Sequence, residues 1–260
     1  MKRLFGKTFD FVASIGEDCA CAMYLRRFGL RDCSSPMDWV FKASFAIRID
    51  LICSDFATFM EKEDFRRCDT TGARLEDRRN DPYENVETGF WFVHDFPAGV
   101  PMDESFPVVK AKYDRRIGRF MRRVASSRNV LLVWWSKDKH LTDNVLREAR
   151  DRIAARFPAS NVHLLAFEND MSARPTRFDD VDEMIIRVTG AFVPVAGVTM
   201  GDPAACGPVF ARIRRHGMFR DAAKRWLAEA FARIVSSFHI SKERRHEARR
   251  RLTEKWVGHA

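Results

Sequence analysis

The sequence predicts an α/β domain with a mostly parallel sheet flanked by helices, and a helical C-terminal appendage. Short apolar runs typical of buried strands alternate along the chain with amphipathic patterns of helical period, which is the element order of a parallel α/β fold. Of the 260 residues, 46% are hydrophobic, enough to bury a sizeable core. The excess positive charge lies at the C-terminal end. We therefore expect the α/β domain over residues 1–200 and a basic helical extension, packed on it, over 201–260.

The first strand is predicted over residues 9–15 and ends at Gly16. Asp18 is expected to cap the helix that follows, because its carboxylate can accept hydrogen bonds from the first N–H groups of that helix. The next segment, RDCSSPMDW (31–39), is interpreted as a loop turning into another helix. An apolar stripe over 45–59 has helical spacing and indicates that helix.

The rest of the chain continues the alternation. Residues 61–88 are polar and rich in turn-forming residues, so we expect a long excursion there. Apolar periodicity predicts strands over 90–93, 129–135, 161–167 and 183–188, and helices over 103–124, 142–157, 203–216, 220–238 and 241–256.

Three predicted strand ends carry residues capable of chemistry: Gly16–Cys19, His94–Asp95 and Ser136–His140. In a parallel α/β sheet the functional crevice lies beyond the carboxyl ends of the strands. The first two ends would therefore place a thiol and an imidazole at the same edge of the sheet.

Cys19 falls in the first turn of its predicted helix, where the positive end of the helix dipole favours a thiolate. His94 fits a partner that would lower the thiol pKa further, and a thiolate–imidazolium pair is the working state of a cysteine hydrolase or acyl transferase. The backbone N–H groups of 18–20 are candidates for an oxyanion hole. The alternative is purely structural, a buried cysteine and a histidine with a packing role.

The third member of such a site stays open. Asp38 is one candidate for orienting the imidazole, while Asp138, Glu168 and Asn169 fit the chain order nucleophile, base, then acid or amide. Substrate contacts are expected from residues of the same segments: Ser14, Gly16, Asp18, Ser35 and Asp95.

No metal or cofactor site is predicted. Cys19 and Cys21 face apart on a helix, and the sequence has no second Cys/His pair with ligand spacing and no glycine-rich phosphate motif. We recognise neither an export signal nor a run of about 18 apolar residues, which a membrane span needs. We therefore expect a cytoplasmic protein with six reduced cysteines.

The net charge of +9 belongs to the C-terminal segment, because residues 207–260 hold 14 Lys and Arg against 5 Asp and Glu. Such a segment can contact nucleic acid or an anionic membrane, but no nucleic-acid-binding motif accompanies it. We favour a solvated, arginine-rich helical hairpin. The sequence leaves the oligomeric state open.

Three stretches, SIGEDCACAMYLRRFGLRDCSSPMDWV (14–40), VHDF (93–96) and KYDRRIGRF (112–120), resemble a bacterial domain-of-unknown-function family labelled "putative papain-like cysteine peptidase". The likeness covers roughly residues 10–170. It implies action on a peptide or another acyl compound, with Cys19 as nucleophile, His94 as base and Asp38 in the shared block. The alternative is a non-catalytic α/β module that binds a glycan, a nucleotide or a protein in the same crevice.

Overall fold

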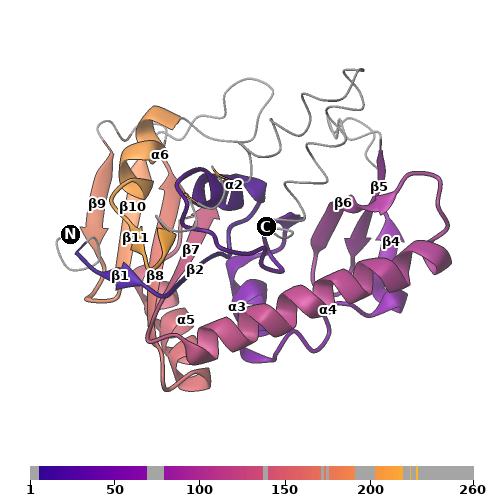
Figure 1. The fold of residues 1–260 in the computed structure, drawn as a ribbon, viewed down its shortest axis with the longest axis horizontal. Coiled ribbons are helices and arrows are strands. Elements are labelled where there is room, and N and C mark those ends of the chain that lie inside the picture. The colour runs from indigo at the N-terminus through magenta and orange to yellow at the C-terminus, as the bar shows by residue number, and fades with distance from the viewer. Residues whose placement is uncertain are drawn as a thin grey trace.

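The computed structural model describes residues 6–68, 79–136, 140–170, 173, 176–190 and 203–218, together with 223 and 227. Over these residues it has a five-stranded sheet, a four-stranded sheet and a two-stranded ribbon. The two larger sheets stand side by side, and the long helix α4 (Met102–Ser126) runs past both (Figure 1). The α/β class is confirmed, but the sheets are mixed or antiparallel rather than mostly parallel.

The five-stranded sheet has the order β2 (Phe11–Ser14), β7 (Asn129–Ser136), β8 (Asn161–Asn169), β10 (Ile185–Gly190), β9 (Arg177–Asp180). The first four strands are parallel to one another, as the alternating pattern predicts, whereas β9 is antiparallel to β10. The sequence does not predict β9, because its residues, RFDD, are polar apart from one and mostly exposed.

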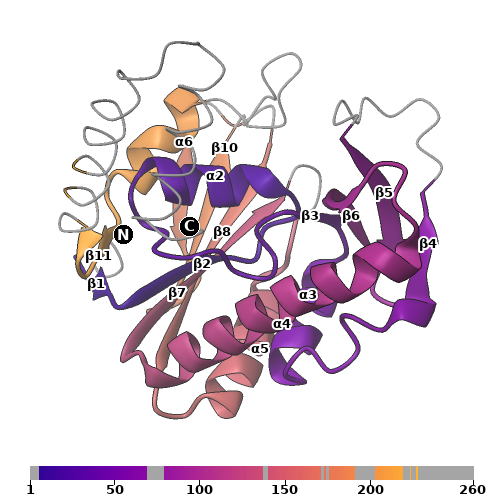
Figure 2. The ribbon, with the colours of Figure 1, turned by 45° about the vertical axis from the view of Figure 1, so that its right-hand side comes forward.

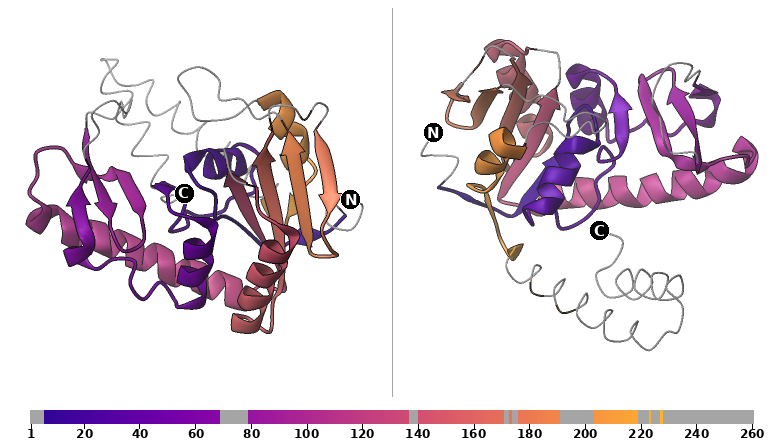
Figure 3. Two further views of the ribbon diagram at one scale, coloured as in Figure 1. Left: turned by 180° about the vertical axis from the view of Figure 1, so that it is seen from behind. Right: turned by 90° about the horizontal axis from the view of Figure 1, so that it is seen from above.

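Both faces of this sheet are covered by helices. Alternate residues of a strand point to opposite faces, and in β7 Leu132 and Trp134 belong to one buried cluster while Leu131 and Val133 belong to another. Burial on both faces explains why these strands are continuous apolar runs in the sequence. The first face is covered by α4 and by α3 (Phe45–Cys53) and α5 (Asp143–Arg156), and the second by α2 (Cys19–Arg27) and α6 (Pro203–Phe210) (Figure 3).

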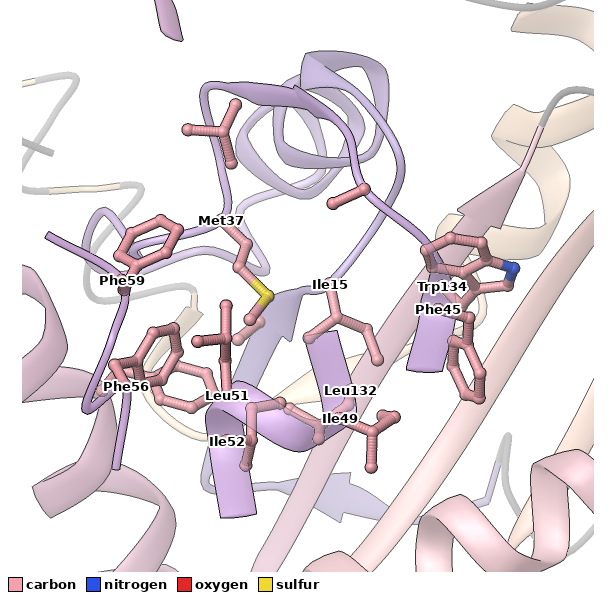
Figure 4. Close-up of a cluster of buried hydrophobic side chains, with 14 of the residues drawn as sticks. Ile15, Met37, Phe45, Ile49, Leu51, Ile52, Phe56, Phe59, Leu132 and Trp134 are labelled. Atoms are coloured by element: carbon pink, nitrogen blue, oxygen red, sulfur yellow. The ribbon is translucent and has the colours of Figure 1, made fainter. Parts of the chain in front are cut away.

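The core on the first face joins side chains that lie far apart in the sequence. Figure 4 shows Leu132 and Trp134 of the sheet beside Ile49 of α3, with Met37 contributed by the preceding loop. The Phe45 ring packs edge-on against Trp134, with 5.1 Å between ring centroids. This cluster fixes α3 against the sheet.

The four-stranded sheet is antiparallel throughout and has the order β3 (Val40–Lys42), β6 (Phe90–Pro97), β5 (Asn80–Asn85), β4 (Phe65–Arg67). Two predictions are wrong here. Strand β6 does not belong to the parallel sheet, and the expected excursion over 61–88 contains the short 3-10 helix η1 (Lys62–Asp64), β4 and β5. An antiparallel sheet often has one buried face and one face in contact with solvent, and the residues on the solvent face can be polar. These polar residues interrupt the apolar runs by which strands are predicted from a sequence.

Helix α4 holds the two sheets together. Near its N-terminus, Phe106 packs on Phe65 of β4 with 5.4 Å between ring centroids. Near its C-terminus, Phe120 packs on Phe11 of β2 at 5.8 Å. Because one rigid helix contacts both sheets, the seam between them is a defined part of the fold.

The predicted start of the first helix is confirmed, whereas the predicted bounds of the next helix are not. Helix α2 begins after Asp18, whose Oδ1 accepts from Ala20 N at 2.8 Å, as predicted. Helix α3 is shorter than its apolar stripe, because Asp55 and Phe56 adopt positive φ angles of 57° and 61° just beyond its end. The loop over 31–39, expected to turn into a helix, ends in a turn over 36–39 that leads first into β3.

The described part of the C-terminal segment packs on the body. Strand β11 (Arg214–Arg215) pairs with β1 (Thr8–Phe9), so the helix expected over 203–216 stops early, at Phe210. Phe210 is fully buried and stacks on Tyr24 of α2. The division at residue 200 remains a prediction. Of the helix expected over 220–238 the structure describes only residues 223 and 227, both helical, and the helix expected over 241–256 lies outside the described residues. None of the described helices has both the length and the hydropathy needed to cross a membrane.

Gly16, between β2 and α2, has no room for a side chain. A Cβ there would lie 2.8 Å from the Cys21 Cβ and 3.1 Å from the Trp135 Cβ. We expect Gly16→Ala to lower the free energy of unfolding by about 1–3 kcal/mol, because neither neighbour can retreat from a packed core. Denaturant unfolding measures it.

Gly118→Ala is the matched control. Gly118 lies inside α4, and the nearest atom to an added Cβ is the Nη1 of the flexible Arg122, at 3.6 Å. This variant should gain up to about 1 kcal/mol from helix propensity. Equal stability of the Gly16 variant and the wild type would contradict the close packing of α2 on β7.

Candidate active site

The parallel strands β2, β7 and β8 end together at one edge of the five-stranded sheet. Ser136, the last residue of β7, is in register with Glu168 of β8. Beyond β2 the chain continues along β7, where Glu17 N donates to Trp135 O at 2.9 Å. Ser136 Oγ in turn donates to Glu17 Oε2 at 3.3 Å. Glu17, Ser136 and Glu168 therefore form a row across three neighbouring segments.

Cys19 is the first residue of α2, directly after this row. Its side chain is 8% exposed. The C-terminal end of α2 packs on α6 through Tyr24 and Phe28, so the N-terminal end with Cys19 faces the other way, toward the four-stranded sheet (Figure 2). The positive end of the helix dipole lies at this thiol, as the sequence predicts.

Arg48 of α3 joins the segment before Cys19 to the four-stranded sheet. Its Nη2 donates to Glu17 O at 3.3 Å and to Lys42 O, at the end of β3, at 2.7 Å. The guanidinium is fully buried and lies 4.5 Å from the Phe90 ring centroid. Burial lowers the pKa of Arg48 to about 9, although the carboxylates of Glu17 and Asp18 oppose the shift. Cys19 is therefore held at the seam between the two sheets.

His94 lies on β6, inside the strand rather than at its end. The pairing of β6 with β5 jumps from Phe92–Tyr83 to Phe96–Asp81, so three β6 residues stand opposite Pro82 and form a bulge. Bulges re-aim side chains, and the exposed His94 ring packs 5.7 Å from the Phe41 ring. The expectation that His94 shares a parallel sheet with Cys19 is wrong, because β6 belongs to the antiparallel sheet. Its role as base stays a prediction.

Asp38, Ser35 and Ser14 are brought together, but in a buried network. Asp38 Oδ2 accepts from Arg31 Nη1 at 2.7 Å and Ser35 N at 2.9 Å, while its Oδ1 accepts from Ser35 Oγ at 2.9 Å. Ser35 Oγ also lies 3.5 Å from Ser14 O, and Ser14 Oγ accepts from Gly16 N at 3.1 Å. Burial raises the pKa of Asp38, and Arg31 and the Ser35 bonds oppose that shift. These contacts hold the 31–38 loop against β2.

Asp95 is directed at α4. Its carboxylate accepts from Tyr113 Oη at 2.8 Å and also from Lys112 Nζ. Burial is the main reason that the pKa of Tyr113 is raised. The two residues of the sequence pair His94–Asp95 thus engage different partners.

A second histidine lies at the edge where Cys19 begins its helix. His140 Nδ1 is 3.1 Å from Glu168 Oε2, and Glu168 Oε1 accepts from Leu141 N at 3.0 Å. Arg187 of β10 adds an ion pair to Glu168 at 3.2 Å. The sequence offers Ser136–His140 as a strand end and Glu168 as an orienting acid but does not join them. The register of Ser136 with Glu168 joins them, and that register is set by the tertiary structure.

Four of the other cysteines lie in surroundings that disfavour their thiolates. No disulfide forms among the six cysteines, all of which lie in described residues. Burial raises the pKa of the Cys21 thiol, raises that of Cys33 to about 12 and that of Cys68 to about 11, and also raises that of Cys53. These four thiols are therefore weak nucleophiles at neutral pH.

Asp38→Ala tests the structural role of that carboxylate. Removal of Asp38 takes away the carboxylate that binds the buried Arg31 guanidinium, which is 1% exposed, at 2.7 Å. We expect a loss of about 3–5 kcal/mol in the free energy of unfolding, measured by denaturant titration. The double variant Arg31→Met/Asp38→Leu removes both charges and should lose much less. Wild-type stability of Asp38→Ala would show that the pair does not hold this loop.

Comparison with known proteins places the chain in a protein family. No curated protein and no solved structure matches the chain. A family model described as "Putative papain-like cysteine peptidase (DUF1796)" matches residues 10–169, which include Cys19, His94, His140 and Glu168. That range agrees with the resemblance over roughly 10–170 and covers more than half of the chain. The protein therefore belongs to this family of papain-like cysteine peptidase candidates.

Proposed function

We propose that the protein is a thiol-dependent hydrolase that cleaves a peptide or a related acyl compound, with Cys19 as the nucleophile. One observation carries the proposal: Cys19 is the first residue of a capped helix, at the carboxyl edge of the parallel strands. The family description supports the reaction class. A helix N-terminus stabilises the thiolate that such a reaction requires.

The chemistry follows from that position. The Cys19 thiolate attacks the acyl carbon, and the carbonyl oxygen becomes an oxyanion that backbone N–H groups can stabilise. The candidates for this oxyanion hole are the backbone N–H groups of residues 18–20 at the start of α2, of which Ala20 N also donates to the Asp18 carboxylate. The bond to the leaving amine then breaks, the amine takes a proton from an imidazolium, and water releases the acyl group from Cys19.

The base in this proposal is a histidine. The family resemblance nominates His94, whose bulged strand β6 pairs with β3, the strand that Arg48 ties to the Cys19 segment. The carboxylate of Asp38, which is one candidate for orienting it, and that of the adjacent Asp95 both have other partners. Asp38 binds Arg31, and Asp95 binds Tyr113. His94 thus remains a candidate for the base, without Asp38 or Asp95 as its acid.

The test is selective alkylation of the folded protein. At neutral pH we expect iodoacetamide to modify Cys19 faster than any other cysteine, because the thiolate fraction sets the rate. Peptide mapping after a brief reaction identifies the modified residue. Half-buried Cys68 is the internal comparison, since burial raises its pKa to about 11. Faster modification of Cys68 than of Cys19 would contradict the assignment of the nucleophile.

Cys19→Ser is the matched variant for activity. It should abolish labelling by a panel of thiol-reactive acyl probes while the thermal midpoint changes little, because serine is nearly isosteric. Cys68→Ser should label like the wild type. Labelling that persists in Cys19→Ser would assign the activity to another residue, and no labelling of the wild type would favour the non-catalytic binding module.

A further inference from the structure

We infer that His140, oriented by Glu168, is the base that activates Cys19. This inference rests on the proposed function, because it assigns a partner to the same nucleophile. It places the reactive groups in the chain order Cys19, His140, Glu168, all at the carboxyl edge of three adjacent parallel segments.

The placement follows from the strand register. Glu17 N is bonded to Trp135 O and the Glu17 carboxylate to Ser136, so the chain entering α2 lies against the end of β7. Ser136 is in register with Glu168 on the other side of β7. His140 sits over that Glu168 at 3.1 Å. The Cys19 segment and the imidazole therefore flank the end of a single strand.

The geometry around the imidazole fits a base. Nδ1 faces the Glu168 carboxylate, so a proton on Nδ1 leaves Nε2 as the basic nitrogen. The Glu168 side chain is 2% exposed while that of His140 is 61% exposed, so a buried anion holds an imidazole that solvent and substrate can reach. The same relation between an acid and an imidazole operates in catalytic triads.

Other charges face this pair. Arg187 of β10 lies 3.2 Å from Glu168, and its Nη1 lies 2.7 Å from Asp143 at the start of α5. Asp143 therefore offsets part of the Arg187 charge. The carboxylate of Glu168 remains hydrogen-bonded to Leu141 N and in contact with His140 Nδ1.

The proton balance is closed within the site. Nε2 of His140 takes the proton from Cys19 Sγ, while Nδ1–H keeps its bond to Glu168, so the thiolate forms beside an imidazolium. When the acyl–nitrogen bond of the substrate breaks, that proton passes to the leaving amine. Glu168 acts through His140 and is a positioning residue.

The experiment measures the rate of Cys19 alkylation by iodoacetamide against pH in the full-length protein. A thiolate–imidazolium pair keeps Cys19 reactive well below the ordinary cysteine pKa. We call the reactivity that persists in this low-pH part of the profile the acid limb. We expect His140→Asn to remove the acid limb and to slow alkylation at mildly acidic pH by more than about tenfold, which corresponds to a rise of one unit in the pKa of Cys19. Glu168→Gln keeps an acceptor for Leu141 N but loses the charge, and should give an intermediate shift. Added imidazole should restore part of the rate in His140→Ala.

His216→Asn is the control for a histidine substitution, since His216 is also exposed and its nearest acid is Asp10, 3.6 Å away and outside this edge. It should leave the profile unchanged, and thermal melts check that each variant is folded. His94→Asn provides the decisive comparison. An acid limb lost in His94→Asn and kept in His140→Asn would overturn the inference while leaving Cys19 as nucleophile. A wild-type Cys19 with no acid limb would overturn both proposals.

Discussion

The fold depends on a buried guanidinium at the junction of its two sheets. Arg48 donates from one nitrogen to the carbonyls of Glu17 and Lys42, which belong to the two sides of the seam. Taking such a cation out of water costs several kcal/mol, and the cation is compensated by these carbonyls, by the faces of Phe90 and Trp134, and by the nearby carboxylates of Glu17 and Asp18. The groups that offset the desolvation cost of Arg48 include Glu17 and Asp18, so the same contacts position the residues just before Cys19.

The backbone at the same junction is strained, as expected of a place where the fold is tightly constrained. Lys42 and Ala43, between β3 and α3, both have positive φ angles, 58° and 46°, which are unfavourable for residues with a Cβ. The Lys42 carbonyl that this turn presents is the one that Arg48 binds. Helix α4 then fixes the sheets on either side through Phe106 and Phe120. A rigid frame therefore surrounds the start of α2.

The buried carboxylates around the start of α2 differ in their partners, and the partner indicates whether a carboxylate stabilises the fold or serves a reaction. Asp38 and Asp95 are buried and saturated by Arg31, Ser35, Lys112 and Tyr113. Glu168 is also buried, yet one of its partners is an exposed histidine at the sheet edge. The difference lies in the partner: a guanidinium or a phenol completes a structural network, whereas an imidazole can exchange a proton near neutral pH.

The sequence by itself determined several local elements and the place of Cys19 at the start of a helix. Apolar runs buried on both faces predict β2, β7 and β8, and Asp18 predicts the start of α2 and the place of Cys19, because these signals are local in the chain. Only the tertiary structure decided which strands share a sheet. The polar outer faces of β4 and β5 hid the antiparallel sheet, so β6 and His94 were assigned to the wrong edge. Likewise, His140 and Glu168 are 28 residues apart and meet only through the register of β7 with β8, a non-local pairing that periodicity does not encode.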